Sequence, residues 1–366
     1  MSAEASPSGT RPTWPEPEAK LRSVVEAEFA PAGVFLNSAT LGLPPRRTLE
    51  AMRADFERWA TGVASAPDYD AAVDSSRAAE ARLHHVPVEW VAIGSQTSPH
   101  VGIVAASVPD RTNVLVAHHE FTSVSFPFLA QSGRGVNVVE VPLETLADAV
   151  DETTGWVAVA AVASADGRRA DLAAIREACD RHGARMLVDT TQSAGWLDLD
   201  VSRYEVTVCS AYKWLLAPRG TSFMIVRPEL WTEIVPINAG WYAGGDVWDS
   251  IYGPPLRLAG NARRYDVSPG WPAWVGTAAS LGLIEEIGVP AIEAHDLGLA
   301  SAAADAFGVD DPVSAVLSID VAHLPDLEAR LAGAGIRAAV RNGALRLSFH
   351  LYNSLADVEA VAAALT

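Results

Sequence analysis

The chain has 366 residues and a formal net charge of −18, with 27 Lys and Arg against 45 Asp and Glu. Its length exceeds the usual size of one domain, so two domains in close contact are expected. Because nucleic acids and anionic membranes need clustered basic residues on their partners, this charge argues against both. The two cysteines, Cys179 and Cys209, lie in apolar patterns and do not indicate a disulfide framework.

The first 18 residues contain four prolines and little apolar periodicity, so residues 1–18 are predicted to be disordered. This segment lacks the apolar core of a signal peptide, and no apolar run in the chain approaches the length of a membrane span. A cytoplasmic protein is therefore expected.

The next part of the chain is predicted to be mostly helical. A helix is expected over residues 20–29, followed by a short apolar strand that starts at Val34 and runs into the polar turn 37–40. A long amphipathic helix is expected from Pro44 to about Thr61, and a further helix over residues 71–84. Apolar residues recur at helical spacing in the long helix, namely Leu49, Met52, Phe56 and Trp59.

A candidate phosphate site follows the predicted strand 90–93. Gly94-Ser95-Gln96-Thr97-Ser98 leads to Pro99, predicted at the first helical position, and to an apolar helix over residues 101–108. The N-terminus of a helix offers free N–H groups and a positive dipole to phosphate. An ordinary N-cap has the same residue types, and the Gly-Lys-Ser/Thr signature of a P-loop is missing.

Two further strands are followed by polar residues. The strand 113–116 precedes His118-His119, but no His or Cys partner at ligand spacing supports a metal site there. The strand 156–162 ends near Ser164.

Two short apolar runs, 186–188 and 206–209, have the composition of buried parallel strands. The first ends on Asp189, and the second ends at Ser210-Ala211-Tyr212-Lys213. If both lie in one α/β sheet, these side chains converge on a crevice at its carboxyl edge, where such sheets bind ligands. Taken singly, a solvated Lys and an N-capping Asp are the commoner interpretations. Together they suit pyridoxal phosphate, which a lysine binds as a Schiff base while an aspartate keeps the pyridine nitrogen protonated.

The segments that carry these residues resemble those of a known family. Ser210-Ala211-Tyr212-Lys213-Trp214 with Pro218-Arg219-Gly220, and Asp189-Thr190-Thr191-Gln192-Ser193, are similar to the Schiff-base and Asp-x-x-Gln segments of class V aminotransferases. This pyridoxal phosphate-dependent family includes cysteine desulfurases, kynureninases and isopenicillin N epimerase. The resemblance runs from about Phe35 to the C-terminus. It implies an α/β protein of fold type I, with a large cofactor-binding domain over residues 19–275 around a mostly parallel sheet, and a small α/β domain over residues 276–366.

The resemblance also implies roles for individual residues. Lys213 and Asp189 are the expected catalytic residues, and Arg346 and Asn37 are expected to bind the substrate. Phe121 lies where the family stacks an aromatic ring on the cofactor, and a core Phe is the alternative. The other cofactor-binding residues expected are Gln96, Thr97, Ser210 and Tyr212 at the phosphate, Ser164 and Gln192 at the phenolic oxygen, and Trp241.

The segment 238–274 is rich in Gly, Pro and Trp and is too long for a plain connector. In the related fold this segment crosses a subunit interface, so the resemblance implies a homodimer. Arg263-Arg264-Tyr265-Asp266 and Ser268-Pro269-Gly270-Trp271 are similar to the part that reaches the partner's phosphate, and an ordinary surface loop is the alternative.

From about Thr277 the pattern changes to Ala-rich helices and short strands, predicted over residues 313–319, 337–340 and 344–349. Arg346 lies in the apolar third strand, where a charge is costly unless it is paired. The resemblance implies a bidentate contact with the α-carboxylate of the substrate. A salt bridge to an acidic residue is the alternative.

Cysteine desulfurases carry their persulfide Cys just before this strand and a His where this chain has Phe121. Residues 338–344 contain no Cys, so a protein persulfide is disfavoured. We predict an enzyme that acts on a small α-amino acid by amino-group transfer or Cβ elimination, with epimerisation as the alternative. An NAD(P)-dependent oxidoreductase would need a G-x-G-x-x-G turn, which is missing. Loss of Lys213 or Asp189 would favour a non-catalytic binding protein of the same fold, and both residues are present.

Overall fold

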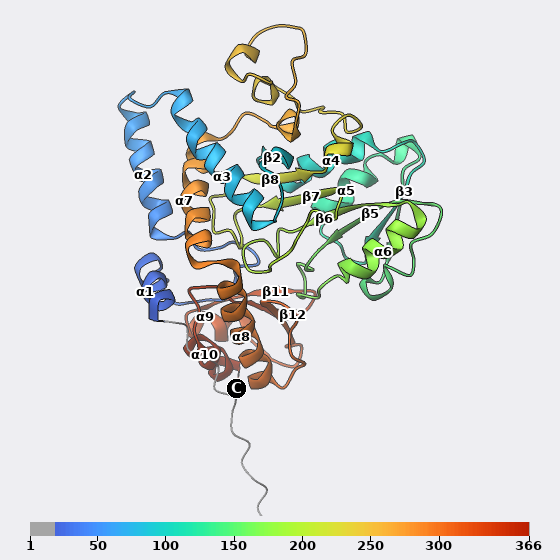
Figure 1. Ribbon diagram of the computed structural model, residues 1–366. Coiled ribbons are helices and arrows are strands. Elements are labelled where there is room, and N and C mark those ends of the chain that lie inside the picture. The colour runs from blue at the N-terminus through green and yellow to red at the C-terminus, as the bar shows by residue number, and fades with distance from the viewer. Residues whose placement is uncertain (1–18, 366) are drawn as a thin grey trace, which may run out of the picture.

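The computed structural model describes residues 19–365, so the segment predicted to be disordered lies outside the described residues. A seven-stranded sheet forms the centre of the larger part of the chain (Figure 1). Its strands, in spatial order, are β2 (Val91–Gly94), β8 (Ser222–Val226), β7 (Val206–Ser210), β6 (Arg185–Asp189), β5 (Thr154–Ala160), β3 (Asn113–Ala117) and β4 (Asn137–Val141). The five strands from β7 to β4 are parallel, and β8 runs antiparallel to both of its neighbours. The predicted mostly parallel sheet is confirmed.

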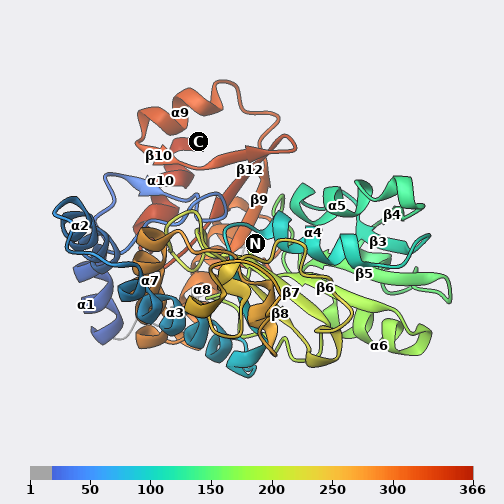
Figure 2. The ribbon, with the colours of Figure 1, turned by 90° about the horizontal axis from the view of Figure 1, so that it is seen from above.

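Helices cover both faces of this sheet, which explains why its strands are continuous apolar runs. On one face, α4 (Thr97–Ser107) and α5 (Thr122–Leu129) pack on one hydrophobic cluster. On the other face, α3 (Asp70–Leu83) and α6 (Leu172–His182) pack on a second cluster. Seen from above, α5 and α6 lie on opposite sides of the strands (Figure 2).

The start of α4 differs from the prediction. The helix begins at Thr97, after the extended residue Gln96, so Pro99 is its third residue rather than its first. Proline is tolerated there because the first four N–H groups of a helix have no partner inside the helix. The consequence is that the hydroxyl and N–H of Thr97 lie at the helix N-terminus.

The long helix α2 (Arg46–Ala60) forms as predicted, but much of its apolar stripe is exposed in this chain. Thr48 faces α7 (Trp271–Ile287), where its hydroxyl lies 2.7 Å from that of Ser280. Leu49, Phe56 and Trp59 point away, and Trp59 is 65% exposed. The periodicity therefore identified the helix, although this chain alone does not cover the apolar face.

The smaller part of the chain is built mainly from its C-terminal third. A three-stranded antiparallel sheet has the order β11 (Ala339–Arg341), β12 (Ala344–Ser348) and β9 (Val316–Asp320). It packs with α8 (Val289–Phe307), α9 (Leu327–Gly333) and α10 (Leu355–Leu365). The N-terminal strand β1 (Val34–Phe35) joins this part, because it pairs in parallel with β10 (Ile336–Arg337). The boundary predicted at residue 276 falls inside α7, which packs on α2 and α3.

Gly288 separates α7 from α8 and has a φ of +87°, which an L side chain rarely adopts. The two helices are bent by 82° relative to each other. In the described part of the chain no single helix meets the length and composition of a membrane span, and only this bent pair does so jointly.

Candidate active site

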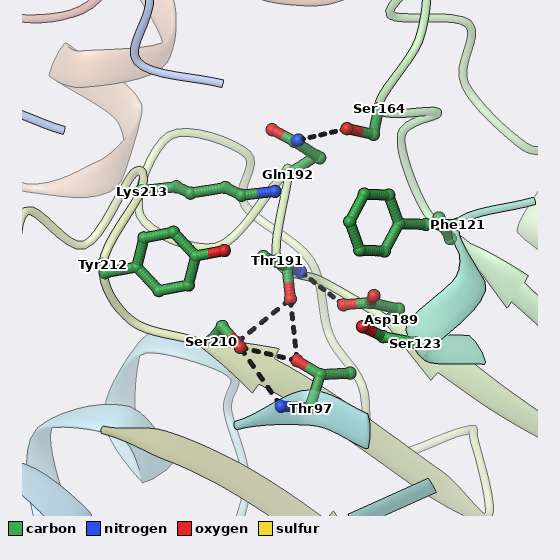
Figure 3. Close-up of a pocket in the computed structure, with 11 residues that line it drawn as sticks. Thr97, Phe121, Ser123, Ser164, Asp189, Thr191, Gln192, Ser210, Tyr212 and Lys213 are labelled. Atoms are coloured by element: carbon green, nitrogen blue, oxygen red, sulfur yellow. Dashed lines mark hydrogen bonds between the residues drawn. The ribbon is translucent and has the colours of Figure 1, made fainter. Parts of the chain in front are cut away.

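The carboxyl ends of β6 and β7 meet at one edge of the sheet, as the sequence predicts. β6 ends on Asp189, and the parallel strand β7 ends on Ser210, shortly before Lys213. A cavity with about 360 Å³ of empty space, part of it open to solvent, lies at this edge (Figure 3). Its lining residues are Thr97, Phe121, Ser123, Ala160, Ser164, Asp189, Thr191, Gln192, Ser210, Tyr212 and Lys213. Most of the predicted cofactor-binding residues are thus brought together.

Lys213 is buried, and its amine faces two aromatic rings. The Nζ atom lies 5.3 Å from the centroid of the Phe121 ring and 5.8 Å from that of Tyr212. Burial lowers the pKa of the amine to about 8, with Asp189 opposing the shift and Arg346 adding to it. A lysine with this pKa is partly neutral near neutral pH, so it can act as a nucleophile and as a base.

This lowered pKa predicts how cofactor capture depends on pH. Because only a neutral amine attacks an aldehyde, the rate at which cofactor-free protein captures pyridoxal phosphate should rise with pH and level off above about 8. Timed borohydride trapping from roughly pH 6 to 10 measures this rate, with a free lysine derivative as the control. A rate that keeps rising as steeply as the control up to the ordinary lysine pKa of 10.5 would contradict a buried amine.

Asp189 presents its carboxylate to the cavity. Its Oδ1 accepts a hydrogen bond from the Thr191 N–H at 2.8 Å. Burial raises the pKa of this carboxyl, while the Thr191 bonds and the Lys213 charge oppose the shift. A second cation beside Oδ2, such as a protonated pyridine nitrogen, would favour the ionised form further.

Three hydroxyl groups gather at the N-terminus of α4. The Thr97 Oγ1 lies 2.7 Å from the Ser210 Oγ and 3.3 Å from the Thr191 Oγ1, and the Thr97 N–H donates to the Ser210 Oγ at 3.2 Å. Hydroxyls beside the positive end of a helix dipole form a site that suits an anion such as phosphate. Thr97 and Ser210 were predicted here, and Thr191 was not.

Gln192 organises the opposite wall of the cavity. Its Nε2 group donates to the Ala39 carbonyl at 3.0 Å and to the Ser164 Oγ at 2.8 Å, and its Oε1 accepts from the Trp214 indole N–H at 2.8 Å. Both amide hydrogens of Gln192 are therefore engaged. The Ser164 hydroxyl, which accepts from Gln192, keeps its own hydrogen free to donate into the cavity.

Arg346 approaches this wall from β12. Its Nη1 group donates to the Ser164 carbonyl, and its Nη2 group donates to the Thr40 Oγ1 at 2.6 Å. Arg346 is 2% exposed. Within residues 19–365 its side chain donates to a carbonyl and to hydroxyls and forms no ion pair with an acidic residue, so the alternative of a salt bridge finds no support there. Asn37 lies in the same turn as Thr40 and does not line the cavity, but its buried Oδ1 has no hydrogen-bond partner in residues 19–365.

Phe121 is the N-cap residue of α5 and lines the cavity. Hydrogen bonds to the side chain of the preceding residue, Glu120, fix the backbone at this point. The Glu120 Oε1 accepts from the Phe121 N–H at 2.7 Å, and its Oε2 accepts from the Ala160 N–H at 2.9 Å. Burial raises the pKa of Glu120 to about 7, and the nearby Asp189 adds to the shift. No role was predicted for Glu120 from the sequence, although its position directly before Phe121 was a signal.

Two predicted cofactor-binding residues do not line the cavity of their own chain. Gln96 is exposed and immediately precedes α4. Trp241 lies in the segment 238–274 and packs against Tyr242 and Trp248, with ring centroids 5.2 Å apart in each pair. Ser123, which was not predicted, does line the cavity.

The same segment is anchored by a buried ion pair. The Asp266 Oδ2 lies 2.8 Å from the Arg77 Nη2, and the Asp266 Oδ1 accepts from the Ile93 N–H at 2.8 Å. Asp266 is fully buried, so its carboxylate fixes the segment to β2 of its own chain rather than reaching outward.

Neither cysteine reaches the cavity lining. Burial raises the pKa of the Cys179 thiol to about 12 and that of the Cys209 thiol well above its ordinary value. Thiols in this state are poor nucleophiles, because the thiolate is the reactive form. Across residues 19–365 no group of three or more His, Cys, Asp or Glu side chains could hold a metal ion.

These groups fit pyridoxal phosphate by their chemistry. Lys213 supplies an amine of lowered pKa, Asp189 a carboxylate oxygen, and the hydroxyls at α4 an anion site. In a chain with a net charge of −18, an anionic cofactor needs such oriented local donors.

Known proteins similar to this chain identify its family. The family model for class V aminotransferases matches residues 34–314. The uncharacterized aminotransferase YcbU of Bacillus subtilis is 28% identical over 299 residues, which cover 75% of this chain and 78% of that protein. A probable hercynylcysteine sulfoxide lyase of Mycobacterium tuberculosis is 28% identical over 212 residues, which cover 54% of this chain and 52% of that protein.

The fold is also that of a solved structure. The cysteine desulfurase CsdA of Escherichia coli superposes with a TM-score of 0.80 at 22% identity, covering 94% of this chain and 97% of that one. This likeness confirms the predicted fold type I. Because the family model spans most of the sequence, the chain belongs to the class V aminotransferase family of pyridoxal phosphate-dependent enzymes.

Proposed function

We propose that this enzyme acts on a small α-amino acid whose α-carboxylate binds Arg346. It then transfers the amino group or eliminates a substituent from Cβ, without forming a persulfide on the protein. The observation that carries the proposal is the environment of Arg346. A guanidinium that is 2% exposed has only a carbonyl and hydroxyls as partners in the described chain.

Such a charge is costly to bury without a counter-ion. Burial lowers the pKa of Arg346 to about 10, with Arg341 adding to the shift, so the side chain is still charged at neutral pH. An α-carboxylate beside the guanidinium would supply the missing charge and accept a bidentate pair of hydrogen bonds. The charge of Arg346 contributes to the lowered pKa of Lys213, which supports a carboxylate position near the lysine.

The residues of the chain divide the remaining tasks. Bound pyridoxal phosphate supplies an electron sink for the bonds at Cα. Lys213, with its lowered pKa, moves the proton at Cα. Phe121 lies across the cavity from the lysine and can hold a flat ring, but it has no proton to give (Figure 3).

The absence of a usable thiol supports a route without a protein persulfide. The turn between β11 and β12 contains Asn342 and Gly343, both with positive φ, where cysteine desulfurases carry their Cys. The double variant Cys179→Ser with Cys209→Ser is therefore expected to turn over its best substrate within about twofold of the parent, because both thiols are buried and protonated.

Steady-state turnover and cofactor absorbance of the double variant test this expectation. The single variants serve as controls for packing, since each removes one buried sulfur. If the double variant stays folded and loaded with cofactor but loses turnover, a cysteine takes part in the chemistry.

The names of two relatives support the two outcomes we favour, amino-group transfer and Cβ elimination. A panel of amino acids, scored for keto acid, pyruvate, sulfide and racemised product, separates them. Pyruvate with a released Cβ substituent indicates elimination, and a keto acid that retains its side chain indicates transamination. Racemised substrate alone would point to the alternative, epimerisation. No product from any amino acid would overturn the proposal.

We further propose that the protein works as a homodimer. The segment 238–274 projects from the body of the chain above β2 and β8 (Figure 1). Within this segment Tyr252 is 86% exposed and Leu256 is 76% exposed. We take this exposed apolar surface as part of an interface with a second copy of the chain.

The double variant Tyr252→Ser with Leu256→Ser should shift the protein toward monomer and weaken cofactor binding, because it removes apolar area from the interface. Sedimentation velocity at several concentrations measures the shift. Val313→Ser is the matched control, since Val313 is 57% exposed but lies outside this segment. A parent protein that is monomeric and still binds the cofactor tightly would contradict the dimer.

A further inference from the structure

A buried acid–histidine pair connects α8 to the segment that carries Lys213. The His350 Nδ1 lies 3.2 Å from the Asp296 Oδ2, and neither side chain has any exposed surface. On the other side of the ring, the His350 Nε2 lies 3.0 Å from the carbonyl oxygen of Trp214. Trp214 is the residue directly after the lysine.

The partners of His350 fix its hydrogens. A carbonyl oxygen only accepts, so Nε2 must carry a hydrogen and donate it to Trp214. The Nδ1 atom faces the Asp296 carboxylate at ion-pair distance, so these two buried polar groups offset part of each other's desolvation cost.

The Trp214 carbonyl belongs to a stretch of backbone that has little freedom. A Cβ atom on Gly42 would lie 2.0 Å from the Lys213 carbonyl oxygen, and one on Gly195 would lie 3.0 Å from the Trp214 oxygen. Leu216 holds a φ of +56°, a left-handed conformation that is costly for a leucine. A strained backbone persists only where its surroundings hold it, and the hydrogen bond from His350 is one such restraint.

His350 also lies close in sequence to the proposed substrate arginine. Arg346 is in β12 and His350 follows that strand by two residues. One short segment therefore carries both the guanidinium beside the cavity and the imidazole that holds the backbone after the lysine. The Trp214 indole, which donates to Gln192, ties the same backbone to the cavity wall.

We infer that His350, held by Asp296, is a positioning residue for Lys213: its hydrogen bond to the Trp214 carbonyl fixes the backbone from which the lysine side chain enters the cavity. This inference rests on the proposed function, in which Lys213 moves the proton at Cα. A proton transfer of this kind is sensitive to displacements of about 1 Å, which can cost roughly a hundredfold in rate.

The chain contains a matched control for a merely structural role. At the C-terminal end of α3, the Nε2 of the C-cap residue His84 lies 3.3 Å from the Glu80 Oε1, and the His84 Nδ1 lies 3.5 Å from the Leu199 carbonyl. Both side chains are buried. The pair resembles the Asp296–His350 pair in burial and chemistry, but its carbonyl is not next to Lys213.

The test compares four variants of the full chain, before and after loading with pyridoxal phosphate. His350→Phe keeps a ring and loses both contacts, His350→Asn cannot reach the Trp214 carbonyl, and His350→Gln places an amide donor near the position of Nε2. His84→Phe is the control. In cofactor-free protein, hydrogen–deuterium exchange of residues 211–217 should be roughly tenfold faster in His350→Phe and His350→Asn, because a buried acceptor loses its donor. In the loaded enzyme their kcat should fall by about tenfold or more while KM changes little.

His350→Gln should restore most of the protection and of kcat, and His84→Phe should leave both at the level of the parent. If His350→Phe does not fold, His350→Asn and His350→Gln decide the question. Exchange of residues 211–217 that is the same in His350→Asn as in the parent would overturn the inference. If the parent protein fails to bind the cofactor at Lys213, the proposed function fails, while the exchange comparison still decides whether His350 holds this segment.

Discussion

Replacing Lys213 with Ala is expected to abolish covalent capture of pyridoxal phosphate and to lower turnover by at least roughly 10²–10⁴-fold, because the base at Cα is lost with the amine. The chain contains only two lysines, Lys20 and Lys213, and Lys213 lines the cavity. The fold should survive, since nearby contacts such as the hydrogen bond from Gly42 N–H to the Tyr212 carbonyl, 3.0 Å long, involve backbone atoms alone.

Borohydride reduction followed by peptide mass spectrometry measures the adduct. Lys20→Ala is the matched control, because Lys20 lies at the start of α1 (Ala19–Glu28) and its loss should leave both the adduct and turnover unchanged. A reducible adduct that persists on another amine of Lys213→Ala, together with retained turnover, would contradict the assignment of this lysine.

The parts of the site that the sequence predicted are those set by local composition. The apolar runs at 186–188 and 206–209 became β6 and β7, and the residues directly after them reached the cavity because parallel strands end at one edge. Arg346 could be singled out in the same way, since a charge inside an apolar strand needs a reason. A cytoplasmic location stays a prediction of the sequence alone.

The parts that could not be predicted depend on loop geometry or on distant contacts. Thr190 and Thr191 are chemically alike, yet the Thr190 hydroxyl bonds the Val208 carbonyl while that of Thr191 faces Thr97 and accepts from the Ser210 N–H. Only the turn of the backbone after Asp189 distinguishes them. The pairing of β1 with β10 joins residues far apart in the chain, and no local pattern encodes it.

The apolar face of α2 shows a further limit. Periodicity gives the face of a helix that will be buried, but not the molecule that buries it. Phe56 and Trp59 are exposed in this chain, and the small residues of α7 contact Thr48 instead. A second copy of the chain would explain the exposed residues on α2 and those on the segment 238–274 alike.

Replacing Arg346 with Gln is expected to lower kcat/KM for amino acids by roughly 10- to 100-fold, mainly by raising KM. The reason is that the proposed bidentate pair of charge-assisted hydrogen bonds to the α-carboxylate is lost. Arg346→Lys should recover only part of this loss, since an ammonium keeps the charge but not the paired geometry. The expected effect is specific to the carboxylate, so an amine substrate that lacks this group should react equally slowly with the parent and with both variants.

The matched control is Arg341→Gln. Arg341 is exposed on the neighbouring strand β11, and its charge contributes to the lowered pKa of Arg346, but it makes no contact with the cavity. Removing the Arg341 charge changes the local positive potential but leaves the bidentate contact of Arg346 intact, so KM should change by no more than about twofold. If Arg341→Gln raised KM as much as Arg346→Gln does, the carboxylate would be attracted by the general potential of this edge of the small domain. The guanidinium of Arg346 would then not be the binding site of the substrate carboxylate.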